Sequence, residues 1–82
     1  MSVKIEAAHN ATSSDIEIFR HDFGGNIYRE MPQAIAAVES AGHITIEAAE
    51  GYWVYPADMT DAEIARDVAG YHVLGSIEEV DA

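Results

Sequence analysis

The chain contains no cysteine among its 82 residues, and this absence constrains its folding more than any other feature of the sequence. Disulfide frameworks, thiolate metal sites and cysteine nucleophiles are all excluded. A chain of this length hides roughly 60 to 65% of its extended surface when it folds, so its stability has to come from a hydrophobic core. With 49% hydrophobic residues and only two prolines, the composition supplies such a core. We expect a single domain over residues 1–82.

Acidic residues outnumber basic residues by fifteen to four, which gives a formal net charge of −11 with the histidines neutral. Most of this charge lies in the second half, because residues 43–82 hold nine acids and a single base, Arg66, for a net charge of −8. Such a charge disfavours direct binding to nucleic-acid phosphates or to an anionic membrane surface. Halophilic adaptation is the alternative origin of the acidity, although it usually spreads acids evenly along a chain.

No targeting segment is evident in the sequence. The first residues lack the apolar core of a signal peptide, and no apolar run approaches the ~18 residues of a membrane span. The lack of cysteine fits a reducing compartment. We therefore expect a cytoplasmic protein that does not enter a membrane.

Three elements follow directly from periodicity. Alternating apolar residues predict a strand over residues 3–8, and the same pattern predicts another over residues 43–49. Between them, residues 33–40 read as a short helix, with Pro32 at its first position and Gly42 as its stop.

The segment 16–23 fits two patterns. Its two isoleucines alternate as in a strand, whereas Ser14 and Glu17 match the polar start of a helix. The β-branched and aromatic content favours the strand. Gly24-Gly25 would then form a tight hairpin turn, with residues 26–30 returning as the second strand.

A second hairpin is predicted around Glu50-Gly51. If these two residues form its tip, Ala48 pairs with Trp53 and Ile46 pairs with Tyr55. Trp53 and Tyr55 would then lie on the core face of the sheet. The opposite face would carry Glu47, Tyr52 and Val54.

The clearest local signal is a capping box formed by Thr60 and Glu63, which predicts a helix over residues 61–69 that ends at Gly70. Its inward stripe would be Ile64, Ala65 and Val68, and its solvent side Asp61, Glu63, Arg66 and Asp67. A last strand over residues 71–80 would be interrupted at Gly75. We therefore predict an α+β domain, an antiparallel or mixed sheet with two short helices packed on one face.

The sequence contains no recognisable catalytic or metal-binding motif. Its four histidines (His9, His21, His43 and His72) are scattered and lack helical two-histidine spacing. The acids around Thr60 lack the glycine and the closing glutamate of a calcium loop, and no phosphate-binding glycine loop is present. We expect no catalysis, no cofactor and no bound metal.

Acidic and aromatic residues of the second half form the predicted partner-binding site, because tyrosine beside charge is typical of interaction surfaces. Residues four apart on a helix lie ~6 Å apart, so Glu63 and Asp67 would hold carboxylates at phosphate-like intervals. The predicted site consists of Glu47, Glu50, Tyr52, Asp58, Asp61, Glu63 and Asp67.

Small size, strong acidity, the lack of cysteine and a compact α+β pattern together resemble the anti-CRISPR proteins of phages and mobile elements. The resemblance is one of overall character across all 82 residues; these proteins share no common motif, so no family residue carries over to a position here. It implies a non-catalytic inhibitor in the bacterial cytoplasm, a monomer or homodimer. Its target would be a basic surface of a Cascade-type effector complex, with type I-C as a candidate, where it would block recognition of target DNA.

Two other classes of function stay open. One is an antitoxin-like or regulatory module that binds a protein, and the other is a small metal-binding or enzymatic domain that uses the histidines. An oligomer and a neighbouring toxin gene would favour the first, and metal in the purified protein would favour the second.

Overall fold

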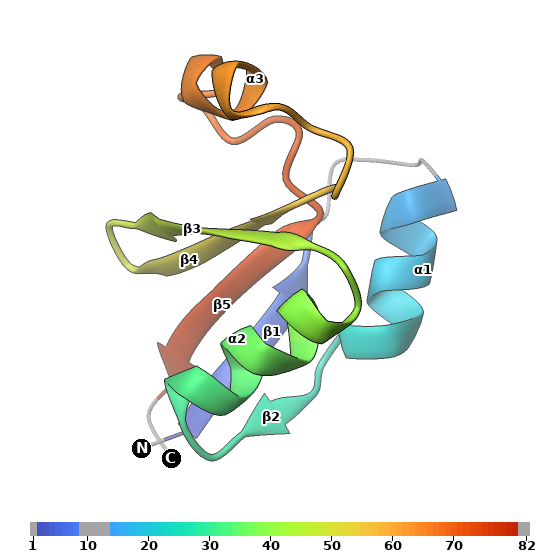
Figure 1. The fold of residues 1–82 in the computed structure, drawn as a ribbon. Helices are drawn as coiled ribbons and strands as arrows, with labels where there is room; N and C mark the ends of the chain where they lie inside the picture. Colours follow the sequence, from blue (N-terminus) through green and yellow to red (C-terminus); the bar gives the residue numbers. More distant parts are fainter. Residues whose placement is uncertain (1, 9–13, 81–82) are drawn as a thin grey trace.

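The fold is known from a computed structural model, which describes residues 2–8 and 14–80. A five-stranded antiparallel sheet has the strand order β2-β1-β5-β4-β3, and two helices lie over one of its faces (Figure 1). The α+β fold class predicted from the sequence is thereby confirmed. In chain order the elements are β1 (Ser2–Ala7), α1 (Ser14–Phe23), β2 (Ile27–Tyr28), α2 (Met31–Ser40), β3 (Ile44–Ala48), β4 (Gly51–Tyr55), α3 (Asp61–Arg66) and β5 (Gly75–Val80).

The centre of the sheet is formed by the first and last strands. β1 pairs with β5 along its whole length, with Ile5 opposite Ile77. The β3–β4 hairpin then joins through β4, where Tyr52 lies opposite Ile77. A long-range pairing therefore positions the hairpin beside the C-terminal strand.

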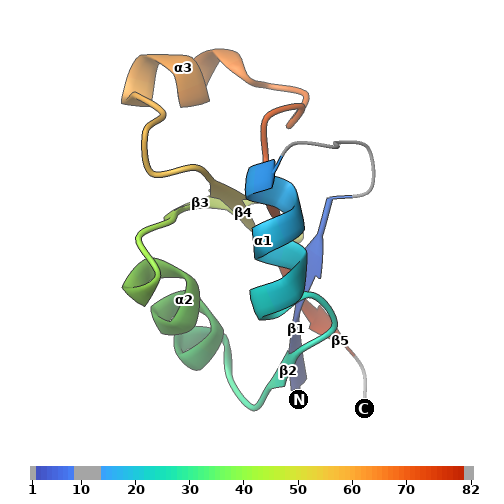
Figure 2. The same ribbon diagram turned by 90° about the vertical axis from the view of Figure 1, so that its right-hand side faces the viewer.

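The hydrophobic core lies between this sheet and helices α1 and α2, which Figure 2 shows on the same side of it. Alternate residues of a strand point to one face, so β1 buries every second side chain. α1 contributes three buried side chains and α2 two. The core comprises Val3, Ile5, Ala7, Ile16, Phe19, Phe23, Ala34, Val38, Val54, Leu74 and Ile77.

The strand predicted over residues 16–23 is wrong, because this segment belongs to helix α1. Ile16, Phe19 and Phe23 are all buried, and their spacing of three and four residues is the period of a helix face. Ile18, which a strand would place beside Ile16, is 57% exposed. Helical burial of the two phenylalanines, whose ring centroids lie 5.2 Å apart, outweighs the strand propensity of the segment.

The hairpin predicted at Gly24-Gly25 is also wrong. These glycines end α1, with Gly25 at φ 79°, a backbone region that glycine adopts without steric cost. The chain then returns as the short strand β2, whose partner is β1. The predicted helix over residues 33–40 is present and begins earlier, at Met31.

The predicted register of the second hairpin is shifted. The tip is Ala49-Glu50, so Ile46 lies opposite Trp53 and Ala48 opposite Gly51. The predicted faces are reversed for β4, since Val54 is fully buried in the core cluster; Tyr55 is buried as predicted, but outside that cluster. Tyr52 is half-buried and packs against that core. The reason is the pairing with β5, which aligns Tyr52 with Ile77 on the covered face.

α3 stands apart from the two core helices at one end of the sheet (Figure 1). It is shorter than the predicted helix over residues 61–69, and none of its residues is buried. Val68, predicted to face inward, is 84% exposed. The two helices on the covered face are therefore α1 and α2.

The last strand is shorter than predicted, because residues 71–74 lie outside any strand and Gly75 is the first residue of β5. A Cβ at Gly75 would overlap the Phe19 ring and the Glu6 carbonyl.

Candidate functional site

The predicted partner-binding residues lie in three different places. Glu47, Glu50 and Tyr52 lie on the β3–β4 hairpin. The acids Asp58, Asp61 and Glu63 are exposed beyond the other end of β4, in the loop and first turn of α3. Asp67 is buried. The seven residues therefore form no single continuous patch.

The hairpin group is larger than the sequence predicts. Pairing between β4 and β5 places Glu78 opposite Gly51, and Glu79 follows it. Trp53 lies on the face of the sheet that α1 and α2 leave open, where it pairs with Ser76. We call this group the acidic hairpin end, and it consists of Glu47, Glu50, Tyr52, Trp53, Glu78 and Glu79.

Two hollows flank the tip of the hairpin. The first, of about 360 Å³, is lined by Glu47, Glu50, Tyr52, Glu79 and Met31 and neighbouring residues. The second, of about 200 Å³, is lined on the open side of the sheet by Glu50, Trp53 and Glu78, among others. An aromatic side chain and at least two carboxylates therefore meet in each hollow.

Within the described part of the chain, none of the four carboxylates of the acidic hairpin end forms an ion pair. Lys4 lies opposite Glu78 in the sheet, but its Nζ lies 3.4 Å from a carboxylate oxygen of Glu6. Arg29 lines a neighbouring hollow that shares Glu79 and Met31 with the first hollow, but it forms no ion pair within the described residues. The negative charge at this end is therefore largely free to attract an external cation.

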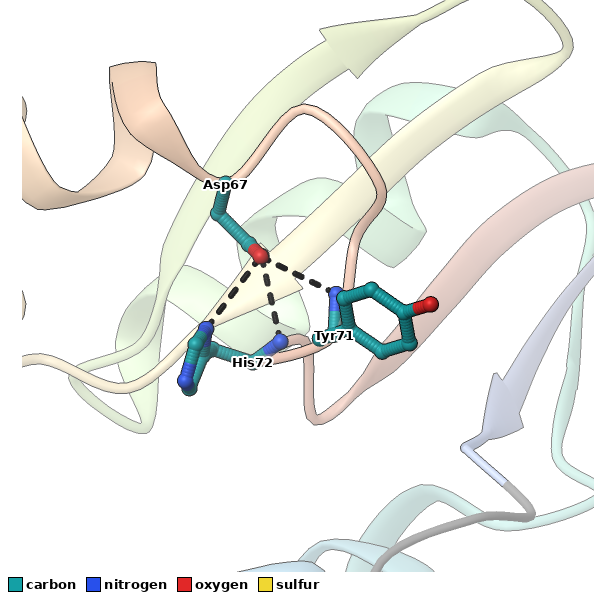
Figure 3. A network of polar contacts seen from close by, with 3 residues as sticks. All are labelled: Asp67, Tyr71 and His72. Atoms are coloured by element: carbon teal, nitrogen blue, oxygen red, sulfur yellow. Dashed lines mark hydrogen bonds and ion pairs between the residues drawn. The ribbon is translucent and has the colours of Figure 1, made fainter.

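Asp67 was predicted to face solvent and is only 8% exposed. It lies just after α3, and its carboxylate accepts hydrogen bonds from the backbone N–H groups of Tyr71 and His72, both at 3.1 Å (Figure 3). One of its oxygens also lies 3.2 Å from Nδ1 of His72. The carboxylate thus holds the turn between α3 and β5 and is not presented as a surface charge.

The ionisation of Asp67 and Tyr55 reflects this arrangement. Burial raises the pKa of Asp67, but hydrogen bonds from His72, Tyr55 and Tyr71 outweigh it and leave the pKa below its ordinary value. Burial, together with the charge of Asp67 and hydrogen bonding to it, raises the pKa of Tyr55 to about 12. The pair is therefore a neutral phenol beside a carboxylate over the whole neutral range.

Glu63 has a structural task of its own. Its Oε1 accepts hydrogen bonds from the backbone N–H and the hydroxyl of Thr60, both at 3.0 Å, and its own N–H donates to the Thr60 hydroxyl. The predicted capping box is confirmed. The hydrogen bonds from Thr60 lower the pKa of Glu63. Only Asp58 and Asp61 are left as exposed acids without such a role in this region.

Three of the four histidines lie in the described residues, and His9 lies outside them. His43 packs edge-on against Phe19, with ring centroids 5.6 Å apart, and His72 contacts Asp67. Within residues 2–8 and 14–80, no three side chains of the ligating types are grouped to hold a metal ion. No helix of that part is both long and apolar enough to cross a membrane.

Sequence reasoning missed Trp53, Glu78 and Glu79 as members of the site. The sequence predicts Trp53 on the core face, and it places Glu78 and Glu79 in a last strand whose neighbour is not predicted. Both errors come from the unpredicted pairing of β4 with β5, since the strand neighbour decides which face of β4 is covered. The alternation of Ser76, Glu78 and Val80 with Ile77 was the available signal.

The chain was also compared with known proteins. No family model matches it, and no match was found among curated proteins or solved structures. Any function therefore has to be inferred from the charge, exposure and contacts of the residues themselves.

Proposed function

We propose that the protein is a non-catalytic acidic inhibitor that binds a lysine- and arginine-rich, nucleic-acid-binding surface of another protein through the acidic hairpin end. The observation that supports this is the gathering of four carboxylates without ion pairs around two aromatic side chains. A basic surface that normally holds phosphates offers the complementary charge. The inhibitor and the nucleic acid would then compete for the same surface.

The expected physical behaviour follows from the net charge of −11. Complementary potentials accelerate the encounter of two proteins, and salt screens this attraction. Tyrosine and tryptophan supply contact area at the centre of an interface, where charge alone gives little affinity. Binding should therefore be fast, tighter at low salt and dependent on both the acids and the rings.

We propose a CRISPR effector complex of the Cascade type as the partner. Small size, acidity and an α+β fold without cysteine are the features that support this choice. The DNA-binding channel of such a complex is the surface that the acidic hairpin end would cover. An antitoxin-like role would use the same surface on a different basic partner.

A gel-shift competition tests this proposal. A purified type I-C Cascade complex is bound to its target duplex, and the protein is titrated in at low and at moderate salt. We expect displacement of the DNA that requires more protein as salt rises. Glu47→Lys combined with Glu50→Lys should raise the required concentration roughly tenfold or more, because like charges across an interface cost several kcal/mol.

The matched control changes the charge by the same amount elsewhere. Asp15→Lys combined with Asp22→Lys alters two exposed acids of α1, and circular dichroism checks that both double variants fold. The control should inhibit nearly as well as the unmodified protein. If the DNA stays bound at every concentration, or if both double variants lose inhibition equally, the proposal is wrong.

A further inference from the structure

On the open face of the sheet, Gly51 leaves an unfilled position among larger side chains. Gly51 lies opposite Ala48 on β3 and opposite Glu78 on β5. Trp53, two residues further along β4, points to the same face. The resulting Gly51 hollow has a volume of about 200 Å³. The register of β3, β4 and β5 places the small Gly51 between the larger side chains of Trp53 and Glu78.

No side chain at position 51 can fill this hollow. A Cβ built on Gly51 would overlap the carbonyl oxygen of Ile77. Any side chain at this position would therefore push β4 away from β5. The space beside Trp53 is a fixed consequence of the backbone geometry.

Trp53 lines one side of the hollow. A Cβ built on Gly70 would lie 3.2 to 3.3 Å from three consecutive atoms of the six-membered ring. Such nearly equal distances place Gly70 over a ring face, because an approach to the ring edge would bring one atom much closer than its neighbours. Tyr55 packs edge-on, with ring centroids 6.5 Å apart. Gly70 and Trp53 together line a neighbouring hollow, whereas Trp53 lines the Gly51 hollow without Gly70.

Two carboxylates give the hollow its charge. Glu50 and Glu78 both line it, together with the hydroxyl-bearing Ser76. No basic residue lines the hollow, and the Lys4 ammonium on the neighbouring strand is 3.4 Å from Glu6. Its volume is below the roughly 300 to 1,000 Å³ of sites for drug-sized ligands. Its size and charge suit the cationic end of a side chain.

We propose that the Gly51 hollow binds the guanidinium group of an arginine side chain. A guanidinium is planar, stacks on tryptophan and donates hydrogen bonds in a fork that two carboxylates can accept. The ammonium of lysine is a compact, strongly hydrated charge that lacks this planar fit. The inference rests on the proposed function and deepens it, because the hollow would hold one arginine of the basic partner.

The experiment uses Trp53 itself as the reporter, since it is the only tryptophan of the chain. N-acetylarginine amide is titrated while tryptophan fluorescence is recorded, with N-acetylcitrulline amide as the uncharged probe of the same shape. We expect a saturable change for the arginine probe, with a dissociation constant on the order of millimolar, and none for citrulline. N-acetyllysine amide should bind several times more weakly.

Two variants of equal charge change locate the site. Glu78→Gln should weaken binding of the arginine probe about fivefold, the effect of one exposed charge pair. Asp15→Asn, a change on exposed α1, should leave it unchanged. Equal responses to arginine and citrulline, equal affinities for arginine and lysine, or equal effects of the two variants would each overturn the inference.

This test needs no partner protein, so its result is separable from that of the gel shift. Arginine binding without displacement of DNA would overturn only the proposed inhibitor function. Displacement of DNA without binding of the arginine probe would overturn only the Gly51 hollow.

Discussion

The buried Asp67 shows how one carboxylate can serve the fold and be lost to the surface. It joins Tyr55 at the end of β4 to the turn formed by Tyr71 and His72. Its lowered pKa means that its contribution to stability is present at neutral pH and is lost as the pH falls through that pKa. A charge exchange at Asp67 would therefore test folding and not partner binding.

Tyr55 gives the opposite dependence on pH. Its pKa rises from 10.0 to about 12 on folding, so its contribution is complete below pH 10 and is lost as the pH rises toward 12. We expect the free energy of unfolding, measured with denaturant, to fall across this window. In Tyr55→Phe the fall should be smaller. An identical slope in both proteins would show that Tyr55 ionises as freely in the folded state as in the unfolded chain.

At the scale of elements, local signals and long-range pairing differ in how far the sequence predicts them. The α3 cap could be predicted because Thr60 and Glu63 interact within one turn. The segment of α1 is predicted as a strand because its residues favour strands locally. Only burial of its apolar face against the sheet stabilises the helix. Glu47, Glu50 and Tyr52 of the acidic hairpin end were predicted, whereas Trp53, Glu78 and Glu79 were missed, since the alternation within β5 does not state that β5 pairs with β4.

The cap of α3 offers a local test. Thr60→Ala removes the hydroxyl that accepts the N–H of Glu63, which typically costs about 1 kcal/mol. Because α3 buries none of its residues, we expect amide hydrogen exchange in its first turns to accelerate about fivefold. The unfolding of the sheet should hardly change. Thr60→Ser keeps the hydroxyl and should exchange as the unmodified protein does; a loss as large as that of alanine would contradict the capping role.

For the whole molecule, the dominant feature is a net charge of −11 that few internal contacts offset. Among the described residues, only Lys4 and Arg20 of the lysines and arginines pair with a carboxylate. Mutual repulsion of like charges destabilises a compact state. The total charge was evident from composition, whereas its division between the acidic hairpin end and the α3 region required the fold.

This repulsion predicts that salt stabilises the protein. The screening length shortens from about 30 Å at 0.01 M to about 8 Å at 0.15 M ionic strength. If screening recovers about 1 kcal/mol, the midpoint of thermal unfolding should rise by about 4 to 8 °C. Sodium and potassium chloride should act alike, because screening does not depend on the ion. A constant or falling midpoint would show that the surface charges do not repel appreciably.

The position of β3 at the margin of the sheet also bears on how the molecule avoids self-association. Its outer backbone groups have no strand beyond them in the described residues, and its exposed Ile46 would favour an added strand. Glu47 lies next to it and is exposed. A charged side chain on such a margin discourages another chain from adding there. The carboxylate of Glu47, proposed to attract a cationic partner, would thus also disfavour edge-to-edge pairing of β3 between two copies of this protein.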